Sequence, residues 1–444
     1  MGRLFGTDGV RGVAGIELTR DLASGLGRAA VMVLGRHGEG RPTFVVGRDP
    51  RESGTWLQEA VADGICAAGG DVILAGVEPT PAVAFLTTDA GASCGVVISA
   101  SHNPPEYNGI KFFDRTGMKL DDALEDEIEG VLRTGEEPPR ELARGRVREI
   151  GEGRERYLRH LLDAASSSLR GMRVVVDCAN GAASELAPEL LRRLEADVVA
   201  IHARPDGRNI NDGCGALHPE VVAAEVVRLG ADAGVSHDGD ADRALFADAQ
   251  GNVIDGDQVL AASAVAMRDT GELAGDTVVA TVMSNVGFLR SMREHGIEVV
   301  QTRVGDRYVL EEMEARGATL GGEQSGHVIF RRQATTGDGL LTAVRFLSLA
   351  ASRGVGVGEL AAVMTRYPQV MVNVTVPNRD ALVDAAAVES AIADAEAELG
   401  DRGRVLVRPS GTEPLIRVMV EAETEEQARR HTEAIATVVR DTLA

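Results

Sequence analysis

Ser101 stands where a side chain could do chemistry. The apolar run 94–98 ends just before it, and His102-Asn103-Pro104 follows. A serine beside a histidine raises the question of acyl transfer. Neighbouring side chains of an extended segment point to opposite faces, so His102 is expected to be badly placed to deprotonate Ser101. The G-x-S-x-G elbow is also absent, since Asn103 stands where its second glycine would be. Another role is predicted for this serine.

Three aspartates at alternate positions form the segment HDGDADR: Asp238, Asp240 and Asp242. In an extended or turning loop, alternate residues share a face, and three carboxylates there repel one another unless a cation lies among them. All-oxygen ligation suits Mg²⁺. A calcium EF-hand is excluded, because Arg243 and Ala249 occupy its glycine and glutamate positions. We predict a Mg²⁺ site.

The segment RPSGTEPLIR has the composition of an anion site. Successive backbone N–H groups in a tight Ser-Gly-Thr turn form an anion nest, to which hydroxyls and arginine add donors. Phosphate is the expected ligand of Arg408, Ser410, Gly411, Thr412 and Arg417.

The segment GEQSGH offers three polar side chains in a glycine-rich turn: Glu323, Ser325 and His327. A carboxylate that accepts from two vicinal hydroxyls is a usual way to hold a sugar, and a histidine adds a titratable group. A plain glycine-rich turn would explain the segment equally well.

The basic residues are almost all arginine: of 46, only Lys111 and Lys119 are lysines. Neither lysine follows a glycine, which excludes a Walker A loop. A lysine kept at 111 indicates a need for a proton that can be lost, whereas Lys119 is interpreted as a surface residue. Arg11, Arg48 and Arg51 lie in glycine-flanked loops, and each is interpreted singly as a salt-bridged surface arginine.

Composition limits the class of protein. The 444 residues carry a formal net charge of −22, which argues against nucleic-acid binding because that needs a basic face. No apolar run approaches the ~20 residues of a membrane span, and the N-terminus lacks an apolar signal core. The scattered cysteines suit reduced thiols, so a cytoplasmic location is expected. Cys214 and His218 have ligand-like spacing without a second pair and are interpreted as structural.

Strand-like runs alternate with helix-like segments, which is typical of α/β layers with mainly parallel strands. The pattern divides into four blocks, which we predict as domains: 1–150, 151–250, 251–366 and 367–444. The first three are expected to be α/β, and the last a smaller α+β domain. Ligands of open α/β sheets bind beyond the carboxyl ends of strands, so loops converging on one central cleft are expected.

Taken together, these segments resemble the α-D-phosphohexomutase superfamily. FGTDGVRG, SASHNP with NGIKFF, DGDADR, GEQSGH and RPSGTEPLIR occur in that family's order across nearly the whole chain. The resemblance implies four domains around a cleft, three of them related α/β domains with mixed or mainly parallel sheets. It implies that Ser101 is a phosphoserine and that one Mg²⁺ is bound by Ser101, Asp238, Asp240 and Asp242.

Further roles follow from the resemblance alone. Arg243 would steady the phosphoryl group, Lys111 and His327 would take part in proton transfer, and Arg11 would lie near the transferred group. The sugar-binding and distal-phosphate loops would supply the substrate contacts: Glu323, Ser325, Arg408, Ser410, Gly411, Thr412 and Arg417.

The implied reaction is an intramolecular phosphotransfer. Phosphorylated Ser101 would donate to glucosamine 6-phosphate, giving glucosamine 1,6-bisphosphate. This intermediate would turn end for end and return its 6-phosphate, leaving glucosamine 1-phosphate for UDP-N-acetylglucosamine and cell-wall synthesis. FGTDGVRG and GEQSGH favour glucosamine, whereas SHNPPEYNGIK would also suit a phosphomannomutase or phosphoglucomutase of the same superfamily.

Two other classes remain as alternatives: a non-catalytic sugar-phosphate binder, and a Mg²⁺-dependent phosphatase with Asp238 as nucleophile. The expected partners are hexosamine phosphates, with no nucleic acid and no membrane, and a homodimer is compatible with the sequence.

Overall fold

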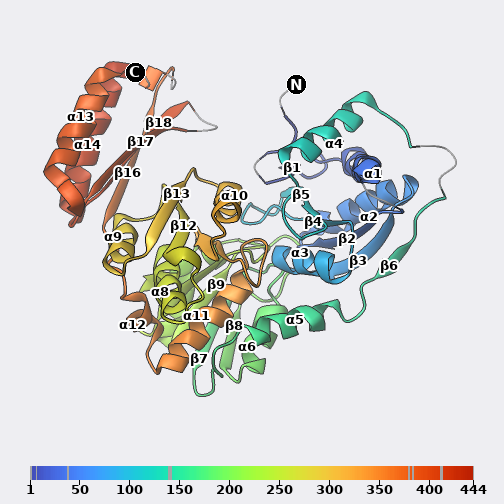
Figure 1. Ribbon diagram of the computed structural model, residues 1–444, viewed down its shortest axis with the longest axis horizontal. Coiled ribbons are helices and arrows are strands. Elements are labelled where there is room, and N and C mark those ends of the chain that lie inside the picture. The colour runs from blue at the N-terminus through green and yellow to red at the C-terminus, as the bar shows by residue number, and fades with distance from the viewer. Residues whose placement is uncertain are drawn as a thin grey trace. The chain divides into compact units, whose positions relative to one another are not determined.

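The computed structural model describes residues 3–6, 8–37, 40–138, 143–378, 381–382, 385–410 and 414–443. Their strands form four sheets, of six, five, four and three strands (Figure 1). The chain divides into two compact units. The larger unit consists of residues 1–283 and 297–362, and the smaller of 284–296 and 363–444.

The first sheet has the order β1-β5-β4-β2-β3-β6. Its strands are β1 (Val10–Val13), β2 (Thr43–Arg48), β3 (Asp71–Val77), β4 (Cys94–Ile98), β5 (Tyr107–Asp114) and β6 (Val147–Glu149). The β4-β2-β3-β6 part is parallel, and β5 and β1 continue it as antiparallel strands.

Helices cover both faces of this sheet. The helices are α1 (Arg20–His37), α2 (Glu52–Ala67), α3 (Thr80–Asp89) and α4 (Asp122–Thr134). Val46 and Val96 pack into one core with residues of α1, α2 and α4. Val45 and Val97, their neighbours along the strands, pack with α3. Because successive strand residues face opposite ways, a sheet buried on both sides reads as a continuous apolar run, as in TFVVG and CGVVI.

The second and third sheets repeat this plan. Their strands are β7 (Arg173–Asp177), β8 (Asp197–Ile201), β9 (Ala233–His237), β10 (Ala244–Asp248) and β11 (Val253–Ile254), then β12 (Thr277–Thr281), β13 (Glu298–Thr302), β14 (Leu320–Gly322) and β15 (Val328–Phe330). In each, three parallel strands are followed by an antiparallel one, β10 after β9 and β15 after β14.

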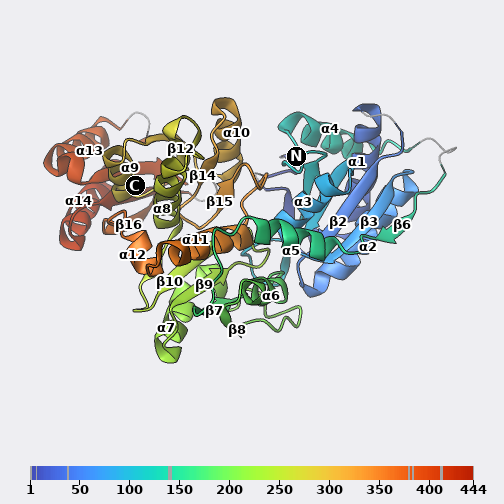
Figure 2. The ribbon, with the colours of Figure 1, turned by 60° about the horizontal axis from the view of Figure 1, so that its bottom comes forward.

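Helices of these two blocks pack together. They are α5 (Gly153–Asp163), α6 (Leu186–Arg193), α7 (Pro219–Leu229), α8 (Gly256–Asp269), α10 (Asp306–Arg316), α11 (Gly339–Arg353) and α12 (Val357–Ala361), with short 3-10 turns at Gly215–Leu217 and Ala274–Asp276. Helices α5 and α11 lie side by side (Figure 2). The Tyr157 hydroxyl on α5 donates to Asp338, which caps α11, at 2.7 Å.

The smaller unit is built on an antiparallel sheet of order β16-β18-β17. Its elements are β16 (Gln369–Thr375), β17 (Arg404–Pro409), β18 (Leu415–Glu421), α13 (Ala386–Leu399), α14 (Glu425–Leu443) and the turn Gly400–Arg402. Val418 and Val420 pack against Ile435 in its core. Helix α9 (Val286–Glu294) belongs to this unit, where the Val286 N–H donates to Glu421 at 2.8 Å.

Each of these predicted motifs lies in the loop between two successive antiparallel strands. Ser101 lies between β4 and β5, the aspartates between β9 and β10, Glu323 between β14 and β15, and Ser410 between β17 and β18. Three α/β blocks with mixed sheets, followed by a smaller domain with an antiparallel sheet, confirm the predicted fold class. Among the described residues, no helix is long and apolar enough to cross a membrane.

Candidate active site

One cavity of the larger unit gathers the predicted residues of its three loops. It has a volume of about 420 Å³, and its lining includes Arg11, Ser101, Asp242, Arg243, Glu323 and His327. The repeated plan explains the convergence, because each loop leaves the carboxyl end of a strand in its own sheet.

Ser101 is buried beside the predicted metal ligands. Its hydroxyl donates to Asp238 Oδ2 at 2.7 Å, and its backbone N–H donates to Ser99 Oγ at 2.9 Å. Its φ is 50°, in the left-handed region that non-glycine residues rarely adopt. The surrounding contacts must therefore impose this conformation.

The expectation that His102 would point away from Ser101 is wrong. Its Nδ1 lies 3.3 Å from Ser101 Oγ, because the left-handed turn at Ser101 replaces the extended backbone on which the argument relied. Burial, together with the charges of Arg243 and Arg11, lowers the pKa of His102 to about 4. The ring is thus neutral near pH 7, and the closest hydroxyl contact remains Asp238.

Arg51 holds the serine loop, a role the sequence did not reveal. It is fully buried and pairs with Asp49 at 2.8 Å. Its guanidinium donates to the carbonyls of Ser101 at 2.9 Å, Asn103 at 2.8 Å and Tyr107 at 3.1 Å, and also to that of Pro104. Its interpretation as a surface residue is therefore wrong. The only available signal was its position just after β2.

Residues of the second block also contact the loop that carries Ser101. Asn211 Nδ2 donates to the carbonyls of Ser101 at 2.9 Å and Asn103 at 3.1 Å. Gly239 lies so close that a Cβ there would stand 2.5 Å from the Ser101 carbonyl oxygen. Thr80 of α3 donates to Asp240 Oδ2 at 2.6 Å. These contacts bring the serine and the aspartates together.

The three aspartates fit a cation. They are buried, and one ligand atom from each lies within 4.8 Å of the others. Among the described residues, none donates a hydrogen bond to the Oδ1 atoms of Asp238, Asp240 and Asp242. Burial, then Asp242 and Asp240, raises the pKa of Asp238 well above its ordinary value. A divalent ion would supply the charge that these carboxylates lack.

Lys111 lies on β5 and is buried. Its Nζ is 3.2 Å from Asp240 Oδ2 and 2.8 Å from Asp8 Oδ2. Burial lowers its pKa, but Asp240 and Asp8 outweigh this and raise the pKa overall. The structure therefore favours the ammonium form. Arg11 pairs with the same Asp8 and reaches to 3.5 Å from the Ala100 carbonyl, next to Ser101.

Arg243 and His327 complete the cationic side of the cavity. Arg243 Nε lies 4.0 Å from Asp238 and 3.7 Å from Asp242. His327 Nδ1 lies 3.5 Å from Asp242, while the Gly337 N–H donates to Nε2 at 3.0 Å. Burial opposes protonation, but Asp242 raises the pKa of His327 to about 9. The Gly337 N–H donates to Nε2, which favours a neutral ring with an unprotonated Nε2. The Asp242 carboxylate favours the charged ring, so each protonation state of His327 has a stabilising partner.

Glu323 and Ser325 lie together in the β14–β15 turn. The carboxylate accepts from the Gly305 N–H at 3.1 Å and from the Ser325 hydroxyl at 3.4 Å. Glu323 lines the cavity. Its orientation is thus fixed by protein donors before any sugar is bound.

In the smaller unit, Arg408 and Arg417 face each other directly across β17 and β18. Like charges directly opposite in an antiparallel pair are destabilising, and an anion between them would relieve the repulsion. Burial and the charge of Arg417 lower the pKa of Arg408. Ser410, at the end of β17, is buried, and Gly411 and Thr412 lie outside the described residues.

Lys119 is not the surface residue that was expected. Its side chain is 14% exposed and forms ion pairs with Asp8 and Asp306.

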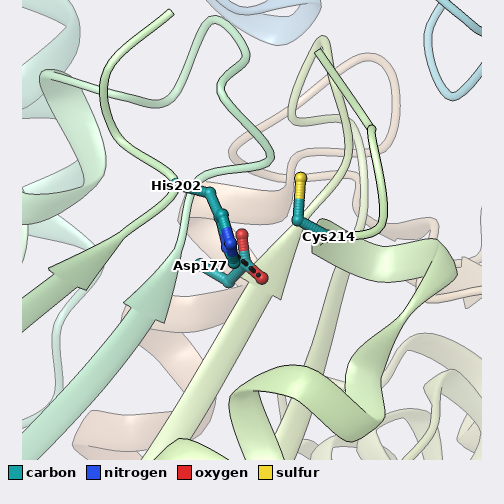
Figure 3. Close-up of side chains that lie close together, drawn as sticks. All are labelled: Asp177, His202 and Cys214. Atoms are coloured by element: carbon teal, nitrogen blue, oxygen red, sulfur yellow. Dashed lines mark ion pairs between the residues drawn. The ribbon is translucent and has the colours of Figure 1, made fainter. Parts of the chain in front are cut away.

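Cys214 groups with Asp177 and His202, not with His218 (Figure 3). His202 Nδ1 lies 3.1 Å from Asp177 Oδ2. The same carboxylate accepts from the backbone N–H groups of Ala179 at 2.9 Å and Gly215 at 3.0 Å. Burial, with Asp177 adding to it, raises the pKa of the Cys214 thiol to about 12. Two backbone amides thus hold the Asp177 carboxylate, and the structural role of Cys214 stays a prediction.

Comparison with known proteins agrees with this fold. Four families match the chain, described as phosphoglucomutase/phosphomannomutase alpha/beta/alpha domains I (residues 2–139), II (155–251) and III (255–367) and C-terminal domain (371–438). The chain belongs to the phosphoglucomutase/phosphomannomutase family.

Within this family, two similar relatives are both named phosphoglucosamine mutase. The chain is 54% identical to the phosphoglucosamine mutase of Streptomyces griseus, covering 100% of both chains. It is 55% identical to that of Corynebacterium jeikeium, covering 99% of this chain and 100% of the relative. A solved phosphoglucomutase/phosphomannomutase family protein from Burkholderia thailandensis superimposes with a TM-score of 0.84 at 26% identity, covering 99% of this chain and 97% of the other.

Proposed function

We propose that this protein interconverts glucosamine 6-phosphate and glucosamine 1-phosphate by phosphoryl transfer through Ser101. The observation that carries the proposal is the 2.7 Å contact of the Ser101 hydroxyl with Asp238, one of three buried, crowded carboxylates. The naming of relatives more than 50% identical over the whole chain as phosphoglucosamine mutases supports glucosamine as the sugar.

The residues divide the work as follows. Ser101 carries the phosphoryl group, and Arg243 and Arg11 stabilise its charge from the cavity wall. Mg²⁺, held by Asp238, Asp240, Asp242 and a phosphoserine oxygen, would neutralise charge on the transferring group when bound.

Lys111 and His327 hold and move the proton of the sugar hydroxyl that accepts or releases phosphate. Glu323 and Ser325 orient the sugar ring through its hydroxyls. Ser101 must donate a phosphoryl group to the substrate and later receive one back. A 1,6-bisphosphate intermediate that turns end for end accounts for both steps.

We further propose that the smaller unit binds a phosphate group of the substrate. The Arg408–Arg417 pair across β17 and β18 supports this, because two facing guanidiniums favour a doubly charged anion. Ser410, with Gly411 and Thr412 beyond the described residues, would add donors.

A coupled assay tests the activity. Purified protein with Mg²⁺ and a hexose 1,6-bisphosphate primer should convert glucosamine 6-phosphate faster than glucose or mannose 6-phosphate. A glucosamine rate no higher than the glucose rate would assign the protein to the phosphoglucomutase/phosphomannomutase activity instead. Absence of turnover with every sugar would favour a non-catalytic sugar-phosphate binder.

Mass spectrometry tests the carrier. One acid-stable phosphoryl group on the peptide containing Ser101 is expected in freshly purified protein. An acid-labile phosphoryl group on Asp238 would indicate a phosphatase of the aspartyl type.

A substrate made and used in the cytoplasm fits a cytoplasmic location, and gel filtration with light scattering would show whether the protein is a homodimer.

A further inference from the structure

The two lysines of the chain share one carboxylate. Lys111 Nζ lies 2.8 Å from Asp8 Oδ2, and Lys119 Nζ lies 2.7 Å from Asp8 Oδ1. Every other basic residue apart from histidine is arginine. An ammonium is a compact point charge that fits between carboxylates, whereas guanidinium is a wide planar fork. The retention of lysine at both positions therefore points to a common geometric requirement.

Lys119 also reaches the third domain. Its ammonium pairs with Asp306, the first residue of α10. Asp306 Oδ2 lies 3.9 Å from His327 Nε2. The preceding residue, Gly305, donates its N–H to Glu323 at 3.1 Å. One ammonium thus connects the N-terminal segment with the start of α10, and residues 305 and 306 there approach Glu323 and His327 of the β14–β15 loop.

The backbone at Lys119 is well held. Asp114 Oδ1 accepts from the N–H groups of Thr116 at 2.7 Å and Met118 at 3.2 Å, and the Leu120 N–H donates to the Phe112 carbonyl at 3.2 Å. Lys119 therefore projects from a firm turn at the end of β5, the strand that bears Lys111. It can act as a fixed point for Asp306.

Removal of the ammonium would leave two carboxylates facing each other. Asp8 and Asp306 are 22% and 19% exposed, so water screens their repulsion only in part. The 305–306 segment would be driven outward, and His327 and Glu323 would lose their neighbour on that side.

We propose that Lys119 is a positioning residue for the mutase reaction. By holding Asp8 and Asp306 on one ammonium, it keeps the 305–306 segment against His327 and Glu323. Lys119 does not line the cavity that contains Ser101; with Asp306 and His327 it lines another cavity of about 340 Å³, and in this proposal it acts through its two carboxylate partners. The inference rests on the proposed function.

Three variants test it in the Mg²⁺-loaded enzyme. In Lys119→Met, kcat should fall about 10- to 100-fold, the cost of a small misplacement of reacting groups, with KM changed by less than about 3-fold, since ground-state contacts are kept. Lys119→Arg keeps the charge but brings the wide planar fork of guanidinium, so it should recover only a small part of the lost kcat. The matched control is Arg156→Met, because Arg156 of α5 pairs with Asp89 of α3 at 2.6 Å and does not contact the 305–306 segment; it should keep kcat near that of the parent.

Each alternative outcome is informative. Unchanged kcat in Lys119→Met, or an equal loss in Arg156→Met, would overturn the proposal, and so would a loss confined to KM, which would indicate direct contact with substrate. If Lys119→Met does not fold, Lys119→Gln takes its place. Asp306→Asn combined with Lys119→Met should be no worse than the more damaging single variant, because the two act as one pair; additive losses would contradict this. An inactive parent enzyme would refute the proposed function instead.

Discussion

Arg51 Nη2 donates to the carbonyl oxygen of Ser101 at 2.9 Å. The guanidinium is fully buried and also binds three other carbonyls of the serine loop. A left-handed serine is costly for the backbone, and these donors hold the chain in that conformation. The backbone conformation of the proposed phosphoryl carrier thus depends on an arginine fifty residues earlier in the chain.

Arg51→Met should destabilise the protein strongly. It would leave Asp49 buried without its cation, and breaking a buried pair in this way costs about 3–5 kcal/mol. Urea unfolding measures the change. The control is Arg208→Met, whose pair with Glu52 joins side chains 75% and 64% exposed and should contribute little to stability. Equal effects of both substitutions would show that the buried contacts of Arg51 add nothing.

Ser101→Ala should bind substrate and lose nearly all turnover, because it removes the hydroxyl that contacts Asp238 at 2.7 Å. Isothermal titration calorimetry and the coupled assay measure the two effects separately. Ser352→Ala, on the exposed side of α11, is the control. Turnover close to that of the parent would exclude Ser101 as the phosphoryl carrier.

Metal removal should destabilise the protein as well as inactivate it. Without a cation, Asp238, Asp240 and Asp242 repel one another, and Mg²⁺ should raise Tm in a concentration-dependent way. Asp238→Asn removes one charge, so the metal-free variant should be no less stable than the metal-free parent, and the rise with Mg²⁺ should disappear. Calorimetry with and without chelator provides the measurement. A persisting rise would place the ion elsewhere.

Asp338 should make stability depend on pH. Burial raises its pKa to about 6, whereas an aspartate in an unfolded chain titrates near ~3.9. Between these values the folded state binds more protons, so the free energy of unfolding falls as pH rises from about 4 to about 6 and is constant above. Asp338→Asn should flatten this part of the profile. Asp121→Asn, at the exposed cap of α4, is the control; an unchanged slope in Asp338→Asn would contradict the assignment.

Arg408→Ala should weaken substrate binding. A charge-assisted hydrogen bond contributes about 1.5–3 kcal/mol, so KM should rise by about 10- to 100-fold. Arg402→Ala removes an exposed arginine paired with Glu423 in the same unit and should leave KM unchanged. Inorganic phosphate should protect the parent against heat more than it protects Arg408→Ala. Equal KM values for the parent and Arg408→Ala would show that Arg408 does not bind the phosphate group of the substrate.

The sequence by itself determined the fold class, and it predicted the chemistry of the motifs. Apolar strand runs, helix-like segments between them and five polar segments in order were sufficient for this. Local pattern carries such information, because strand alternation and the donor types of a loop depend on neighbouring residues. The crowding of Asp238, Asp240 and Asp242 was also readable, since alternate positions share a face whatever packs around them.

Only the tertiary structure decided what surrounds those motifs. The roles of Arg51, Asn211 and Lys119 depend on contacts with residues 50, 110 and 187 positions away. No local pattern distinguishes a buried arginine or lysine from an exposed one, since most of the partner carboxylates and carbonyls come from distant segments of the chain. His102 was misjudged for a related reason: the left-handed turn at Ser101 is imposed by distant donors, and it turns the imidazole toward the hydroxyl.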